Sequence, residues 1–175
     1  MTQRMSRERL VRRLAEAEGY LELEMPEKSL QILMGRPDWG TLQFEANLLT
    51  GEAYRIQGHY RDAIKPLEKA AALRPGDINA AVALGWCYKR THCLAQAIDA
   101  LERAERAHPD EPLLHYNLAC YWCLAGGFDR SLTELNLALD LDPDLRERIA
   151  AEADFDRLRG HPEFDRLLLG RAPLV

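Results

Sequence analysis

Residues 112–145 read PLLHYNLACYWCLAGGFDRSLTELNLALDLDPDL, and the same pattern occurs in the two segments before them, 44–77 and 78–111. The segments align without a gap, so three prolines stand 34 residues apart, namely Pro75, Pro109 and Pro143. Other shared columns are Gly51, Gly85 and Ala119, then Tyr54, Tyr88 and Trp122, then Leu67, Leu101 and Leu135. A fixed period of this length indicates one supersecondary unit that stacks on copies of itself.

Each repeat is predicted to form two helices joined by a short turn. In the second repeat, apolar residues recur at helical spacing over 79–90, and Asp77 stands where an N-cap would start that helix. A second helix over about 94–107 has its apolar residues on one stripe. It must end before Pro109, because the residue preceding a proline disfavours α geometry. The sequence therefore predicts an all-α fold built from helical hairpins.

The segments on either side of the three repeats are expected to close the stack. Residues 10–43 match the pattern weakly and are interpreted as a degenerate hairpin that caps the N-terminal end, with Trp39 packing a loop against the first repeat. Residues 146–175 are interpreted as a capping helix and tail, because apolar residues recur there at helical spacing. Terminal repeats need such caps to cover a core face. The predicted organisation is a single domain over residues 1–175.

The composition is that of an ordinary folded protein and excludes several functions. Hydrophobic residues make up 47% and charged residues 29%, and the net charge is −5. A nucleic-acid binder is not expected, because neutralising phosphates requires a basic face. No run of about 18 apolar residues exists, so no membrane-spanning helix is expected. The four cysteines are too few and too clustered for a secreted disulfide framework, which favours a cytoplasmic location.

The repeat columns resemble the tetratricopeptide repeat family. In the third repeat, that family's signature positions hold Tyr116, Asn117, Leu118, Ala119, Trp122, Gly126, Phe128, Leu135, Ala138 and Pro143. Two departures, His92 for a turn glycine and Ser131 for an alanine, do not change the expected fold. The stretch from Asp154 to Phe164 also looks like the closing segment of many bacterial tetratricopeptide arrays. The resemblance implies an α-α superhelix of three full repeats, with a degenerate N-terminal hairpin and a C-terminal capping helix and tail.

In this family, the first helices of the repeats line a concave groove that binds an extended peptide or a partner's helix. The resemblance implies that the groove residues are Leu48, Glu52 and Arg55, then Asn79, Val82, Trp86 and Lys89, then Leu113, Tyr116, Cys120 and Cys123. Members that clamp acidic C-terminal tails have lysine and asparagine where this chain has Leu48 and Glu52, so such a clamp is not expected. An exposed surface of Trp86, Leu113 and Tyr116 predicts an apolar ligand stretch, whose register is set by charged residues.

Cysteines and histidines provide the alternatives to a binding function. Cys120-x-x-Cys123, with Cys87 and Cys93 as further ligands, has the composition of a zinc or redox site. Three of these cysteines fall inside predicted helices, and free cysteine is a common small core residue, so neither a metal nor a cofactor is expected. The histidines are interpreted as exposed residues without a catalytic partner, namely His59, His92, His108, His115 and His161. No catalytic residue is expected.

The leading hypothesis is a cytoplasmic, non-enzymatic adaptor, co-chaperone or scaffold that binds a partner's peptide segment in the groove. A bacterial secretion chaperone is an alternative, which an obligate homodimer would favour. A cysteine-based metal or redox protein on the same scaffold is another alternative, which bound zinc would favour. The binding hypotheses need an open groove, and the alternative for Trp86 is contact with the N-terminal hairpin folded across that groove.

Overall fold

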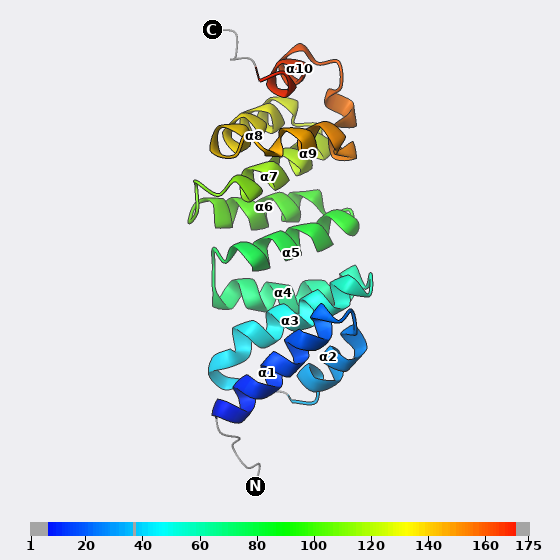
Figure 1. Ribbon diagram of the computed structural model, residues 1–175, viewed down its shortest axis with the longest axis vertical. Coiled ribbons are helices and arrows are strands. Elements are labelled where there is room, and N and C mark those ends of the chain that lie inside the picture. Colours follow the sequence, from blue (N-terminus) through cyan, green and yellow to red (C-terminus); the bar gives the residue numbers. More distant parts are fainter. Residues whose placement is uncertain (1–6, 37, 171–175) are drawn as a thin grey trace. The chain divides into compact units, whose positions relative to one another are not determined.

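The computed structural model describes residues 7–36 and 38–170, and their regular structure is entirely helical (Figure 1). The expected all-α fold is confirmed, since these residues contain no strand. None of the helices they form is long and apolar enough to cross a membrane. The chain divides into two compact units, residues 1–91 and residues 92–175, and each is described by itself. The assignment of a single domain to the whole chain stays a prediction.

The first unit contains two helical hairpins followed by a further helix. Its elements are α1 (Arg7–Glu22), α2 (Pro26–Met34), η1 (Gly40–Leu42), α3 (Gln43–Ile56), α4 (Tyr60–Leu73) and α5 (Ile78–Arg90). Helix α1 packs against α2, so the weakly matching segment 10–43 does form a hairpin. Helix α3 pairs with α4 and also contacts α1 and α5. The first helices of successive pairs are therefore neighbours in this unit (Figure 1).

Local residues set the boundaries of these helices. Asp77 caps α5, because its Oδ1 atom accepts a hydrogen bond from the backbone N–H of Ala80 at 2.9 Å. Gly58, in the turn between α3 and α4, has a φ of 74°, a left-handed conformation that favours glycine. Trp39 is 2% exposed, and its indole N–H donates to the Leu33 carbonyl at 3.2 Å. Trp39 also shares a buried cluster with Ala46 of α3, so it packs this loop against the first repeat, as predicted.

The small-residue column allows close helix packing in the first repeat. Gly51 is a buried residue of α3 on the side that faces α4. A Cβ atom on Gly51 would lie 2.3 Å from Cγ and 2.5 Å from Cδ2 of Leu67. Carbon atoms that are not bonded to each other do not approach so closely, so the two helices keep their separation only without a side chain here.

Replacing Gly51 with alanine is expected to lower the free energy of unfolding by about 1–3 kcal/mol, because the hairpin must open to fit the methyl group. The matched control is Gly19→Ala in α1, where nothing lies within 4 Å of an added Cβ. That change should raise the free energy of unfolding by about 0.5–1 kcal/mol, since alanine is the better helix former. Urea denaturation followed by circular dichroism compares the two variants. Equal effects at the two positions would contradict the close packing at Gly51.

The second unit continues the helical pattern and ends in a folded tail. Its elements are α6 (Leu94–Glu105), α7 (Pro112–Ala125), α8 (Phe128–Leu141), α9 (Leu145–Ala151), η2 (Ala153–Leu158) and α10 (Pro162–Leu168). Helices α7 and α8 form a hairpin, and α6 packs against α7. Ser131, which stands where an alanine is usual, is buried in this hairpin, and its hydroxyl donates to the Ala119 carbonyl at 2.7 Å. The departure at Ser131 therefore leaves no unpaired hydroxyl.

The tail caps the second unit, as the apolar spacing predicted. Phe155, Leu158 and Phe164 are at most 1% exposed. The Phe155 ring meets the Tyr116 ring edge-on at a centroid distance of 6.2 Å and lies 5.9 Å from the Phe164 ring. Helix η2 packs on α7, while α10 packs on α8 and α9. The tail thus supplies part of the core of this unit rather than a separate extension.

Candidate functional site

Seven of the predicted groove residues lie in the first unit, on the neighbouring helices α3 and α5. We call this set the α3/α5 face, and its residues are Leu48, Glu52, Arg55, Asn79, Val82, Trp86 and Lys89. On each helix they recur every three or four residues, a spacing that puts side chains on one side. Asn79 and Trp86 are exposed, and the other five are half-buried. The set therefore forms a continuous stripe of accessible side chains along each of the two helices.

Trp86 is the largest apolar group of the α3/α5 face, with 39% of its surface exposed. The ammonium group of Lys89, one turn further along α5, lies 5.2 Å from the centroid of the Trp86 ring. This cation–π contact restrains the two side chains on the surface. The N-terminal hairpin leaves Trp86 exposed, so the alternative in which that hairpin covers the ring is not observed in the described residues.

A pair of opposite charges lies on the α3 side of the face. The Glu52 carboxylate accepts hydrogen bonds from Nε of Arg55 at 2.9 Å and from Nη2 at 2.6 Å. The hydrogen bond to Glu52 raises the pKa of Arg55 above its usual value, although partial burial opposes this. The Glu52 side chain is 25% exposed and the Arg55 side chain is 35% exposed. The pair therefore offers both signs of charge to a polar group of a ligand.

Leu48 and Val82 add apolar surface to the face. Leu48 packs against a buried cluster formed by Phe44, Ala70 and Ala80. This packing restricts the rotamers of Leu48, so the exposed part of its side chain keeps a fixed position. The α3/α5 face thus combines aliphatic side chains, one exposed indole ring and a charged pair. Such a combination suits the recognition of a polypeptide segment with an apolar residue among polar ones.

The groove residues predicted for the third repeat lie in the second unit, and most of them are covered. Tyr116, Cys120 and Cys123 are 2%, 3% and 0% exposed, and Leu113 is half-buried. The Tyr116 hydroxyl donates to the Glu152 carboxylate at 2.8 Å. Burial raises the pKa of Tyr116 well above its usual value. The predicted exposure of Tyr116 is therefore wrong, because the capping segment packs on the side of α7 that carries these positions.

Two of the buried cysteines, Cys87 and Cys123, lie in surroundings that favour the neutral thiol. Burial raises the pKa of the Cys87 thiol to about 11 and that of Cys123 above its usual value. Nucleophilic and redox chemistry needs a thiolate, which these environments disfavour. Among the described residues, Cys120 forms one candidate metal grouping with Glu152 and Asp154, whose ligand atoms lie within 4.8 Å of one another. This set is short of the four ligands that structural zinc usually takes.

One histidine differs from the expectation that all five are exposed. Those found exposed are His59, His92, His108 and His161. His115 is 2% exposed, and its ring lies between Glu134 on α8 and the carbonyl oxygen of Pro109. The prediction for His115 is therefore wrong, because α8 and the turn before α7 both cover this side of α7. The repeat pattern gave no signal for this burial.

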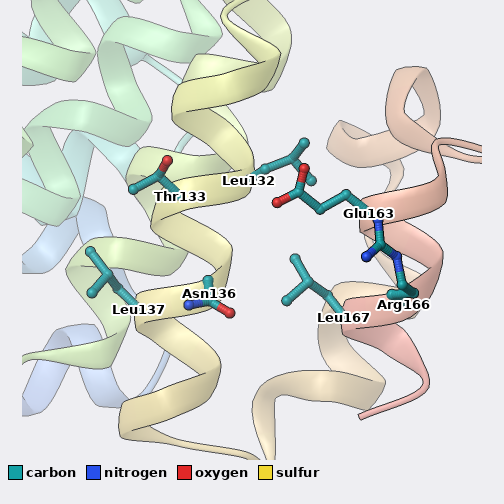
Figure 2. Close-up of a pocket in the computed structure, with 7 residues that line it drawn as sticks. All are labelled: Leu132, Thr133, Asn136, Leu137, Glu163, Arg166 and Leu167. Carbon is teal, nitrogen blue, oxygen red and sulfur yellow. The ribbon is translucent and has the colours of Figure 1, made fainter. Parts of the chain in front are cut away.

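A pocket of about 220 Å³ lies between α8 and α10 in the second unit (Figure 2). Four lining residues come from α8 and three from α10, namely Leu132, Thr133, Asn136, Leu137, Glu163, Arg166 and Leu167. Figure 2 shows the Leu167 side chain pointing from α10 toward α8. Small-molecule pockets usually exceed about 300 Å³, so this hollow does not indicate such a site. Sequence reasoning missed it, because the pocket exists only where the tail packs on α8.

Comparisons with known proteins agree with this architecture. A sequence model described as tetratricopeptide repeat matches residues 54–119. The structure of MamA from Desulfovibrio magneticus RS-1 is 19% identical to this chain, with a TM-score of 0.74 and coverage of 92% of both chains. YrrB, reported as a TPR protein with an unusual peptide-binding site, is 15% identical, with a TM-score of 0.70 and coverage of 89% of this chain and 80% of YrrB. No curated protein matches the sequence.

Proposed function

Because this chain is a tetratricopeptide repeat protein, we propose that it is a non-enzymatic interaction module whose α3/α5 face binds a segment of another protein. The observation that carries the proposal is Trp86, an indole ring 39% exposed at a groove position of the repeat. Tryptophan is enriched among the residues that dominate binding energy at interfaces. The likeness in fold to YrrB, with its reported peptide-binding site, supports the same conclusion.

The side chains of the α3/α5 face define the chemistry of the ligand. An apolar or aromatic ligand side chain would pack on Trp86 and displace water from its exposed surface. Polar groups of the ligand backbone would bond to Asn79 and to the charged pair of Glu52 and Arg55. The face carries two cations, Arg55 and Lys89, and one anion, Glu52, so its net charge is too small to select a ligand through several carboxylates. The expected ligand is a segment with one or two apolar anchors and little net charge.

In this proposal the protein acts as an adaptor or co-chaperone and leaves its partner chemically unchanged. The α3/α5 face offers no cysteine or histidine, and its Glu52 carboxylate is engaged by Arg55. The four cysteines are free, which fits a reducing, cytoplasmic setting. The net charge of −5 argues against a nucleic-acid partner. A protein or peptide is therefore the partner that we propose.

Selection from a random peptide library displayed on phage tests this proposal. The wild-type protein should enrich peptides that share an apolar or aromatic position, because Trp86 supplies the main contact surface. A Val82→Glu variant should lose these peptides, since it places an unpaired carboxylate beside the ring. The control is Leu137→Ala, which alters a residue of α8 with 41% exposure outside the face. Equal binding of the enriched peptides to Val82→Glu and wild type would contradict the proposal.

A further inference from the structure

The core of the second unit contains a buried ionisable pair that the proposed binding function does not use. His115 lies on α7 and Glu134 on α8, and their side chains are 2% and 8% exposed. Taking two such groups out of water is costly unless they are paired and hydrogen-bonded. The surrounding structure must therefore supply hydrogen-bond partners for both side chains, and the geometry of the pair shows which atoms these are.

Both ring nitrogens of His115 face oxygen atoms. Nδ1 lies 2.8 Å from Oε2 of Glu134, and Nε2 lies 2.7 Å from the carbonyl oxygen of Pro109. A backbone carbonyl only accepts, so Nε2 must carry a hydrogen and donate it. The contact between Nδ1 and Oε2 needs a second hydrogen, because two bare lone pairs would repel each other at this distance. Whichever of these two atoms carries it, the pair holds one proton more than a neutral imidazole and an ionised carboxylate together.

The surroundings of His115 favour retention of that proton. The charged groups that act on the ring from the packed helices are acidic, Glu134 on α8 and Glu105 on α6, and the turn before α7 adds the Pro109 carbonyl. Burial by itself lowers the pKa of His115. The hydrogen bonds to Glu134 and Pro109 and the two negative charges outweigh burial, so the pKa lies above the usual value of 6.5.

We propose that His115, Glu134 and the Pro109 carbonyl form a proton-dependent latch, which ties α8 and the turn before α7 to α7 while the proton is bound. Loss of the proton leaves a bare Nδ1 lone pair against a buried carboxylate, and the burial of both side chains hinders water from replacing the lost hydrogen bond. The contacts of α7 with α8 and with the Pro109 turn then weaken. The second unit thereby responds to pH through a single buried site.

The direction of the pH effect follows from the proton balance between the folded and unfolded states. An unfolded histidine releases its proton near pH 6.5, whereas the folded unit retains the proton to a higher pH. Below about pH 6.5 both states hold the proton, and the contribution of the latch to stability is complete. Above about pH 6.5 the equilibrium constant for folding falls by up to about tenfold per pH unit, until the folded site also loses its proton. The latch is therefore strongest in mildly acidic conditions and weakest in alkaline ones.

Urea denaturation at a series of pH values, from about pH 6 to about pH 9, tests the latch through this linkage. The test variant is Glu134→Gln, whose amide can donate to a bare Nδ1 without an extra proton. A second variant, His115→Leu combined with Glu134→Leu, replaces the pair with apolar groups and keeps the comparison possible if the single variant fails to fold. The four exposed histidines are unchanged in all three proteins, so their contributions cancel.

Over this range, the equilibrium constant for folding of the wild-type protein should fall by up to about tenfold per pH unit. In both variants it should change much less with pH. Hydrogen exchange then locates the effect. Amides of residues 107–114, which include the bonds from Glu111 to His108 and from Leu114 to Glu111, should lose protection at high pH in wild type alone. Identical slopes in wild type and the double variant would overturn the latch. A loss of protection spread evenly over every helix would overturn it as well.

Discussion

Replacing Phe155 with alanine is expected to lower the free energy of unfolding by about 3–5 kcal/mol, the range for truncating a large aromatic residue in a packed core. Phe155 is 0% exposed, and its ring contacts the rings of Tyr116 and Phe164 at centroid distances of 6.2 Å and 5.9 Å. The change would leave a cavity beside α7 that these rings cannot fill without moving η2. A large effect is expected because the tail is part of the core.

Two measurements check this prediction. Urea denaturation compares Phe155→Ala with Leu137→Ala, a residue with 41% exposure whose truncation should cost less than about 1 kcal/mol. Modification by a thiol reagent should be slow at Cys120 and Cys123 in wild type and faster in Phe155→Ala, because the segment that covers both cysteines loosens. Similar stability losses for the two variants would show that the tail does not complete the core.

Replacing Trp86 with alanine is expected to weaken the binding of a selected peptide by about 30-fold or more, which corresponds to at least about 2 kcal/mol. Trp86 contributes the largest exposed apolar area of the α3/α5 face, and Lys89 restrains its ring from 5.2 Å away. A restrained ring loses little conformational entropy when a ligand covers it, so most of the burial energy appears as affinity. Removal of the ring leaves Leu48 and Val82 as the apolar groups of the face.

Isothermal titration calorimetry with the same peptide measures this loss. The matched control is Leu73→Ala, which truncates a residue of the first unit with 52% exposure that lies on α4, outside the face. That control should bind within about twofold of wild type, since peripheral contacts contribute little. Circular dichroism of both variants should match wild type. Unchanged affinity of Trp86→Ala would place the ligand elsewhere on the molecule.

Most of the fold could be predicted from the sequence because the repeat depends on local signals. Asp77 caps α5 through a bond to a residue three positions away, so the sequence alone indicated where that helix starts. Gly51 and Leu67 stand at positions that recur in every repeat, and their contact joins the two helices of one hairpin. Each repeat contains the residues that make such short-range contacts, so the pattern predicts them.

The covered residues could not be predicted, because their contacts lie outside the repeat pattern. Tyr116 bonds to Glu152, 36 residues further along the chain in the closing segment. The spacing of apolar residues showed that this segment is a cap, and it did not show which side of α7 the cap would cover. His115 pairs with Glu134 across 19 residues. His115 and Glu134 occupy positions at which the three repeats differ, so no shared column of the alignment predicts that they pair.

Nuclear magnetic resonance of the isotope-labelled protein, titrated with a selected peptide, tests whether the α3/α5 face is the binding site. The amides that shift are expected on α3 and α5, and the indole N–H signal of Trp86 is expected to move. The indole signal of Trp39, which is 2% exposed, should stay in place. Shifts confined to α7, α8 and α10, with the Trp86 signal unchanged, would contradict the assignment of the α3/α5 face as the binding site.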